Sequence, residues 1–291
     1  MVRPLLGAAT CAFFYWFAVN LLVPVGRFLG GEMIALTVPL LVAAALASAL
    51  AMAIFESRSF TELGLAWVGG SGRNLLTGTG LGAVAAMMVI LPPAALGLAH
   101  FEWIANSDFS WRAGAFLPLL LFCGAMGEEI LFRGFALQYL MHGYRRGLHG
   151  HGPGVAIVAG GVIFGFMHAG NPGATPLGLV NTGLFGVLFG AALWRSHDLW
   201  LPIGLHFGWN AVFPFLGVDL SGLTIRVTGY KLVWKAGSLW SGGEYGPEAS
   251  VLCSAALVVL ALAVWKMPVH KGHAYLLDEP AEETSPLPAS W

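Results

Sequence analysis

The sequence predicts an all-α membrane protein, a polytopic bundle of about eight transmembrane helices, and two observations predict it. Of its 291 residues, 57% are hydrophobic and 10% are charged, whereas soluble domains carry roughly 25% charged residues. Apolar runs also recur along the chain, and a helix of about 20 apolar residues is long enough to cross a bilayer. We expect the spans at 5–25, 33–55, 76–99, 113–141, 153–170, 177–195, 199–217 and 249–266.

The segments beside these spans differ from them in composition. The first run follows Arg3, but it is longer than the core of a signal peptide and lacks a clean cleavage site, so we expect a membrane anchor. The 56–74 segment mixes charged with aromatic residues, which is typical of an interfacial segment at the membrane surface. The 218–248 segment is a sizeable loop. The acidic stretch 274–291 has too little apolar content to fold alone.

We expect one integrated membrane domain with three parts. Residues 1–111 hold the N-terminal helices and the interfacial segment, 112–217 the core, and 218–291 the loop, the last transmembrane helix and a disordered tail. Positive charge favours the cytoplasmic side. With a cytoplasmic N-terminus, that side collects Arg3, Arg58, Arg73, Arg145, Arg146, Arg195, Lys266 and Lys271, against Arg27, Arg112, Arg226, Lys231 and Lys235 outside. We therefore expect both termini in the cytoplasm, and a plasma membrane of the bacterial or archaeal type.

The net charge argues against nucleic-acid binding, and the cysteine content argues against a disulfide framework or a cysteine zinc site. The formal net charge is −1, so the chain lacks the basic field that nucleic-acid binding requires. Cys11, Cys123 and Cys253 are far apart, each inside an apolar segment, where a free cysteine packs as a small hydrophobic residue. The sequence therefore predicts no disulfide framework and no cysteine zinc site.

Three charged residues interrupt the apolar run 117–140. An ionisable group at the centre of a spanning helix costs roughly 2.5 to 3.5 kcal/mol on translocon scales, so such groups normally face the bundle interior and mark a site. Glu129 and Arg133 are four residues apart and can form an ion pair on one helix face. Glu128 points about 100° away. It is the carboxylate left for chemistry.

Further polar side chains lie inside three predicted spans. Phe164 and His168 end the fifth span, and His206 shares a helix face with Asn210 in the seventh. We expect a buried cluster of Glu128, His168, His206 and Asn210. Close approach of the helices is favoured by the GxxxG pairs Gly161/Gly165, Gly186/Gly190 and Gly204/Gly208. The alternative is a polar network that only fixes helix register. It leaves the unpaired carboxylate of Glu128 without a role.

The ordered motifs resemble those of a known family. Glu128-Glu129-x-x-x-Arg133-Gly134, Phe164-x-x-x-His168 and His206-x-x-x-Asn210 are similar to the motif set of the CPBP family. This family comprises CAAX proteases of the Rce1 type and bacteriocin-processing enzymes, and is also called the Abi family. The resemblance covers 112–217. It implies an Rce1-like catalytic core in an all-helical intramembrane endopeptidase, with a site that opens towards the cytoplasmic leaflet.

The cluster offers what peptide hydrolysis needs: an activated water, donors for the oxyanion and a proton for the leaving amine. We expect Glu128 to deprotonate a water that His168 also holds. His206 and Asn210 can both donate hydrogen bonds and would face the oxyanion, a role that the resemblance also implies. Structural support is expected from Glu129, Arg133 and Phe164. No cofactor is required.

Zinc is the alternative mechanism. Glu128, His168 and His206 could form a His₂Glu site with one position open for water. Asn210 favours the metal-free mechanism, because a neutral amide is a poor zinc ligand but a good oxyanion donor. The sequence also has no His-Glu-x-x-His helix.

The leading function is an endopeptidase whose partners are membrane lipid and a membrane-anchored or lipidated peptide or protein. A non-enzymatic membrane scaffold or immunity factor could use the same polar cluster. A transporter is a third function, since intramembrane carboxylates and histidines also relay protons, but paired broken helices in two related halves are not found.

One spacing conflicts with the proposed cluster. At about 1.5 Å of rise per residue, Glu128 and His168 lie roughly 20 Å from the cytoplasmic ends of their spans, and His206 only about 10 Å. A tilted helix or a recessed connection at 195–200 has to close this gap.

Overall fold

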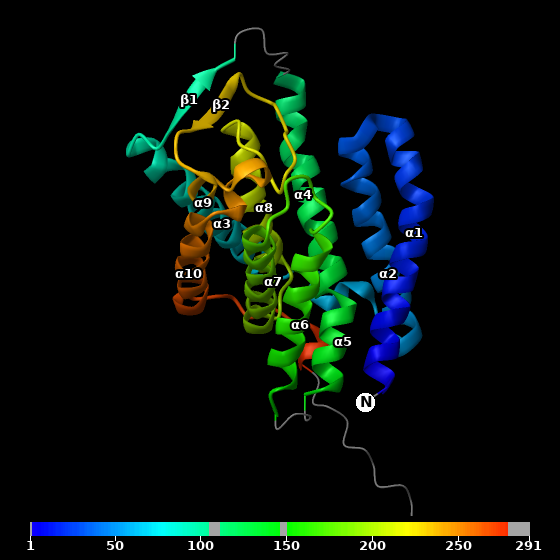
Figure 1. Ribbon diagram of the computed structural model, residues 1–291. Helices are drawn as coiled ribbons and strands as arrows, with labels where there is room; N and C mark the ends of the chain where they lie inside the picture. Colours follow the sequence, from blue (N-terminus) through cyan, green and yellow to red (C-terminus); the bar gives the residue numbers. More distant parts are fainter. Residues whose placement is uncertain (1, 105–110, 146–149, 279–291) are drawn as a thin grey trace, which may run out of the picture.

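The computed structural model describes residues 2–104, 111–145 and 150–278. Its architecture is an all-α bundle, as the sequence predicts, and Figure 1 shows the order of its helices. The longer helices are α1 (Val2–Ala35), α2 (Val38–Glu56), α3 (Ser71–Ala95), α4 (Trp111–Arg133), α5 (Phe135–Gly143), α6 (Gly152–Met167), α7 (Pro176–Ser196), α8 (Trp200–Phe215) and α10 (Val251–Lys266). Short helices are η1 (Phe60–Leu63), α9 (Ser238–Ser241), η3 (Gly243–Tyr245), η4 (Pro247–Ala249) and α11 (Tyr275–Asp278).

Each predicted span contains a helix, but the fourth is divided. The expected helix at 113–141 consists of α4 and α5, which meet at Gly134. Within the described part of the chain, five helical segments are long and apolar enough to cross a membrane, and α6 and α10 are shorter apolar helices. The chain is an integral membrane protein, while the count of eight spans stays a prediction.

Helix starts follow local capping signals. The Thr175 side chain accepts a hydrogen bond from the backbone N–H of Gly178 at the start of α7, where Pro176 occupies the first turn. Ser250 caps α10 in the same way through the N–H of Cys253. These caps fix where the helices behind the site begin.

A small β-sheet is present that the sequence did not predict. Strands β1 (Ala99–Trp103) and β2 (Tyr230–Trp234) pair in antiparallel orientation, with Ala99 opposite Trp234 and Trp103 opposite Tyr230. The two strands lie far apart in the sequence, on either side of the core. They cover the end of the bundle that is opposite the N-terminus (Figure 1).

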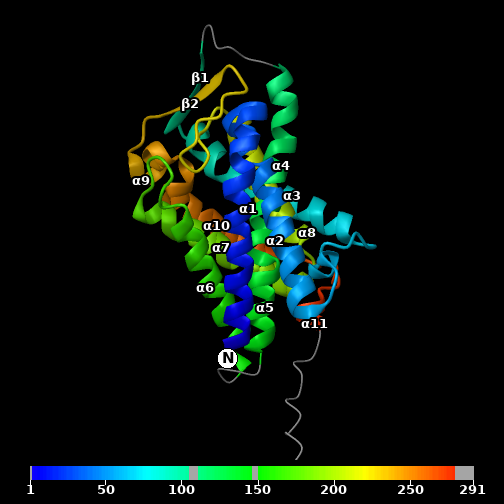
Figure 2. The same cartoon turned by 90° about the vertical axis from the view of Figure 1, so that its right-hand side faces the viewer.

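Helices α1 and α2 form a hairpin on one flank of the bundle. The hairpin stands beside α4 in Figure 1 and crosses in front of the other helices in Figure 2. α1 carries many exposed large apolar side chains along its length, among them Leu6, Trp16 and Phe28. Its helical backbone is interrupted at Gly30 and Gly31, close to the turn into α2.

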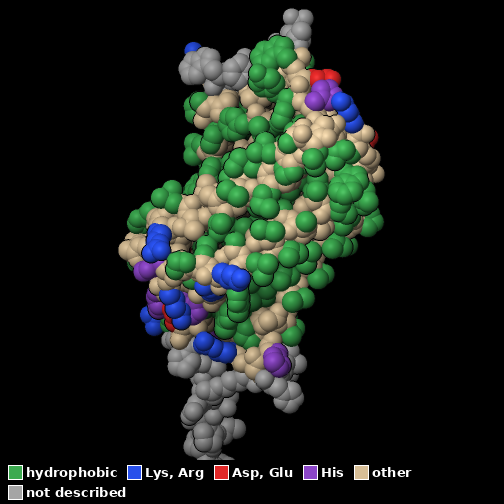
Figure 3. Space-filling view, turned by 90° about the vertical axis from the view of Figure 1, so that its left-hand side faces the viewer, with side chains coloured by type: hydrophobic (Ala, Val, Ile, Leu, Met, Phe, Trp, Pro, Cys, Tyr) green, Lys and Arg blue, Asp and Glu red, His purple; other side chains and the backbone are tan. Residues whose placement is uncertain are grey.

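Apolar and charged side chains occupy different parts of the surface, as expected for a membrane protein. Figure 3 shows hydrophobic side chains over the middle of one face, with charged and histidine side chains gathered towards its two ends. An apolar girdle between polar ends is the pattern that a bilayer stabilises.

The connection between α7 and α8 is buried inside the protein. His197, Asp198 and Leu199 are 6%, 2% and 0% exposed. The 56–74 segment and the chain after α10 cover this turn: the N–H of Leu199 donates to Gly64 O, and the N–H of Gly272 donates to Ser196 O. α8 therefore begins below a layer of other chain segments. This recessed connection places His206 at the depth of the residues it was expected to join.

Candidate active site

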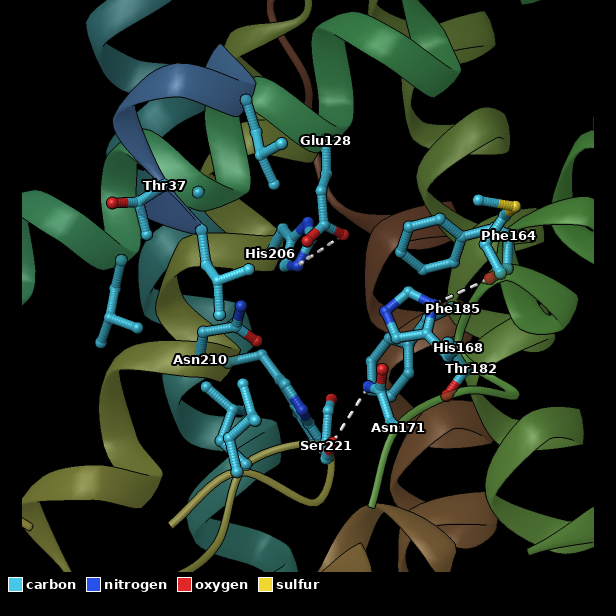
Figure 4. Close-up of a pocket in the computed structure, with 18 of the residues that line it drawn as sticks. Thr37, Glu128, Phe164, His168, Asn171, Thr182, Phe185, His206, Asn210 and Ser221 are labelled. Atoms are coloured by element: carbon cyan, nitrogen blue, oxygen red, sulfur yellow. Dashed lines mark hydrogen bonds and ion pairs between the residues drawn. The ribbon is translucent and has the colours of Figure 1, made fainter. Parts of the chain in front are cut away.

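One cavity of about 380 Å³ collects all four residues that the sequence places in the site. Glu128 comes from α4, His168 follows the end of α6, and His206 and Asn210 come from α8. Figure 4 shows the four side chains around the same space. Apolar residues from the turn between α1 and α2 form the facing wall.

Glu129 and Arg133 form the expected ion pair inside the bundle. Arg133 Nη1 lies 3.1 Å from Glu129 Oε1, and both side chains are almost completely buried. Arg133 also donates to Gly186 O at 3.2 Å, and its guanidinium lies 4.3 Å from the ring centroid of Phe164. Phe164 thus combines core packing with a cation–π contact. The pair holds α4 against α6 and α7.

Glu129 also contacts His206, which the sequence alone did not predict. His206 Nδ1 lies 2.8 Å from Glu129 Oε1, so this ring nitrogen donates to the carboxylate. The ring stacks on Phe189, with centroids 5.2 Å apart and planes at 23°. Together these contacts fix the orientation of the imidazole, so its Nε2 faces Glu128 at 3.9 Å from Oε2.

His168 presents a defined face to the cavity. Its Nδ1 lies 2.8 Å from the carbonyl oxygen of Phe164. A carbonyl only accepts, so Nδ1 carries the hydrogen and Nε2 of the neutral ring keeps a free lone pair. His168 can therefore accept a hydrogen bond from a water in the cavity.

Glu128 differs from its neighbour in the way the sequence indicated. Its side chain is 35% exposed, towards the cavity, whereas Glu129 is fully buried. The Oε2 atoms of Glu128 and Glu129 both have no hydrogen-bond partner among the described residues, so the exposure to the cavity is what distinguishes Glu128. It is the carboxylate that is available to a water or a substrate.

The candidate metal ligands are spaced apart in the described part of the chain. Across the described ranges, no three His, Cys, Asp or Glu side chains are gathered closely enough to hold a metal ion. Glu128 and His206 approach each other, while His168 uses one ring nitrogen on the backbone of its own helix. The metal-free mechanism stays a prediction.

Sequence reasoning missed several residues at the other end of the cavity. Asn171, Ser221 and Glu248 line it there, and Phe189 packs behind His206. Glu248 is a single acidic residue just before the last apolar run, a position that usually indicates the membrane interface. No sequence signal joined it to the core, because its partners lie 27 and 39 residues away along the chain.

Comparison with known proteins gives one match. The model of a family described as "type II CAAX prenyl endopeptidase Rce1-like" matches residues 110–212. The matched region begins one residue before α4, ends within α8 and contains all four cavity residues described above. No curated protein and no solved structure matches this chain. On this match, residues 110–212 are similar to the Rce1-like family of type II CAAX prenyl endopeptidases, and the helical membrane architecture is consistent with that similarity.

Proposed function

We propose that this protein is an intramembrane endopeptidase that hydrolyses a peptide bond of a membrane-anchored or lipidated substrate, with a water activated by Glu128 and His168. One observation carries the proposal: Glu128, His168, His206 and Asn210 line a single cavity, and Glu128 Oε2 is free of a hydrogen-bond partner among the described residues. The family match adds protease activity in general.

The chemistry follows from the positions of the polar atoms. Glu128 takes a proton from a water that also donates a hydrogen bond to His168 Nε2. The water oxygen then attacks the carbonyl carbon of the peptide bond. The Asn210 amide and His206 Nε2 donate to the oxyanion that forms. Protonated Glu128 then gives its proton to the leaving amine, which restores the carboxylate.

The surroundings of His206 suit an oxyanion donor. Its Nδ1–H already bonds to Glu129, so donation from Nε2 requires a doubly protonated ring. Carboxylates face both ring nitrogens, Glu129 at 2.8 Å and Glu128 at 3.9 Å, and they stabilise that positive charge. Glu129 is therefore proposed as a positioning residue for His206 as well as the partner of Arg133.

The apolar wall of the cavity suits a substrate that is anchored in the membrane. Met33 near the end of α1, Leu36 in the turn and Leu40 near the start of α2 line the cavity, together with Leu121 and Leu131 of α4. A lipid chain or an apolar peptide segment buries its surface well against such side chains.

A substrate trap tests the proposal. A Glu128→Gln variant keeps the shape of the side chain but removes the base, so we expect it to bind substrate without cleaving it. The variant is expressed in the native membrane, cross-linked and analysed by mass spectrometry. Glu244→Gln, a change on the exposed η3 turn outside the cavity, is the matched control. Full cleavage by Glu128→Gln would contradict the role of Glu128 as the base, and absence of cleavage by the wild-type protein would favour a scaffold or immunity factor.

Chelation separates the two mechanisms. A metal-free site predicts that purified protein keeps its activity after exhaustive treatment with a chelator, and that zinc does not copurify in stoichiometric amount. If Glu128, His168 and His206 hold zinc, chelation silences the enzyme and added zinc restores it.

A further inference from the structure

The end of the cavity opposite Glu128 is polar. Asn171 and Ser221 lie there in Figure 4, and Asn171 Nδ2 donates to Ser221 O at 3.0 Å. Glu248, from η4, lines the same end. The cavity therefore has an apolar wall, a reactive group of side chains and a second polar region that the proposed mechanism does not use.

Glu248 is a buried carboxylate held by neutral donors. It is 6% exposed. Its Oε1 accepts from Trp209 Nε1 at 2.9 Å, and its Oε2 accepts from the hydroxyl of Ser221 at 2.8 Å and from the N–H of Ser221. The carboxylate oxygens accept in all three hydrogen bonds, as expected for an ionised carboxylate.

No basic side chain compensates this charge. Among the described residues, no Lys, Arg or His nitrogen lies within 4 Å of Glu248. The described lining of the cavity includes two carboxylates, two histidines and no Lys or Arg. His206 faces Glu128 at 3.9 Å, so Glu248 is the lining carboxylate without a basic partner among the described residues. Arg133 lies behind the wall and is already paired with Glu129.

The electric field of these carboxylates acts on any charged group that enters the cavity. Charges in a low-dielectric interior interact several times more strongly than charges in water, and salt screens them less. A buried carboxylate that is left unpaired by its own protein therefore attracts a cation in the cavity and repels an anion.

We propose that the cavity selects a substrate segment with a basic side chain near the scissile bond, and disfavours an acidic side chain or a free terminal carboxylate there, with Glu248 as the selecting residue. The inference rests on the proposed endopeptidase function. It favours an internal or basic segment, as in a leader peptide, over a tail that presents its terminal carboxylate to the cavity.

The test is a panel of synthetic peptides that share one apolar anchor. Each position from three residues before to three residues after the scissile bond carries Lys, Gln or Glu in turn, and each peptide is also made with a C-terminal acid or amide. Wild-type protein in lipid vesicles should show, at one position at least, a kcat/KM at least about tenfold higher for Lys than for Glu. The amide peptides should be cleaved faster than the acids.

Two variants assign the preference to the cavity charge. Glu248→Gln should lower the Lys-to-Glu ratio severalfold, whatever its overall activity, while Glu244→Gln should leave the ratio at the wild-type value. Leu223→Lys adds a cation on the cavity wall, at a side chain that is exposed enough to accept it, and should also lower the ratio. A ratio that neither Glu248→Gln nor Leu223→Lys changes, or a wild-type preference for Glu, overturns the inference.

A binding assay separates this inference from the proposed function. The Asn210→Ala variant retains both cavity carboxylates, and peptide binding to it is measured by fluorescence anisotropy. Preferential binding of Lys peptides without any cleavage by wild-type protein would contradict the endopeptidase function but keep the charge selection. Cleavage without a charge preference would support the endopeptidase function and contradict the charge selection.

Discussion

At the residue scale, two adjacent carboxylates have different surroundings for a geometric reason. Successive helical residues point about 100° apart, so Glu129 pairs with Arg133 and with Nδ1 of His206, while Glu128 lines the cavity and faces Nε2 of the same ring. Loss of either carboxylate should therefore have a different consequence.

Replacement of Glu129 by Ala should destabilise the protein, because it leaves Arg133 buried without its charged partner. Breaking a buried pair costs about 3 to 5 kcal/mol, so we expect a lower melting temperature in detergent and poor expression. Glu128→Ala is the comparison: it breaks no ion pair within α4 and should melt near the wild-type temperature, yet cleave nothing. A stable, inactive Glu129→Ala with an active Glu128→Ala would reverse the assignment.

Asn210 is predicted to act on turnover. Removal of one oxyanion donor lowers kcat by about 10² to 10³, and Asn210→Ala should do so with little change in KM, because the donor acts in the transition state. Steady-state kinetics on one peptide substrate measure both constants. A zinc site would give Asn210 no such role, and the same variant would then be only mildly impaired.

At the scale of elements, α3 and α8 pack with their backbones in close contact. A Cβ built on Gly208 would lie 2.1 Å from Thr79 O, and one on Gly82 would lie 2.2 Å from Leu205 O. Glycine is therefore required on both helices, and this contact positions the helix that carries His206 and Asn210.

Gly208→Ala should force α8 away from α3 and displace Asn210 from the cavity. Overpacking of this kind costs about 1 to 3 kcal/mol, so both the melting temperature and kcat should fall. Gly80→Ala is a matched control on α3, since nothing lies within 4 Å of a Cβ at that position. Equal losses from the two substitutions would show that the close contact at Gly208 is not responsible.

At the scale of the whole molecule, the architecture predicts which surfaces lie on opposite sides of the membrane. Lys231 in β2 and Lys266 at the end of α10 are both exposed. In Figure 1, β2 lies at one end of the bundle and α10 runs away from that end. The first described residues and α11 lie together at the second end (Figures 1 and 2). The location of both termini in the cytoplasm stays a prediction.

Cysteine labelling tests this topology in intact cells. In a Cys123→Ser background, Lys231→Cys should react with a membrane-impermeant maleimide added from outside, and Lys266→Cys should react only after the membrane is permeabilised. The two remaining native cysteines, Cys11 and Cys253, are buried and provide the blank. Labelling of Lys266→Cys in intact cells would invert the orientation that the basic residues predict.

The sequence by itself determined the helical membrane class, the pairing of Glu129 with Arg133 and the residues of the cavity motifs. These features depend on composition and on spacings within one helix, which the helical repeat converts directly into faces. The tertiary structure alone decided the contact between Glu129 and His206, which are 77 residues apart, and the presence of Glu248 at the cavity. It also decided the buried turn between α7 and α8 and the pairing of β1 with β2. Such contacts depend on how each helix is rotated and how deep it sits, and those are set by packing between segments far apart in the chain.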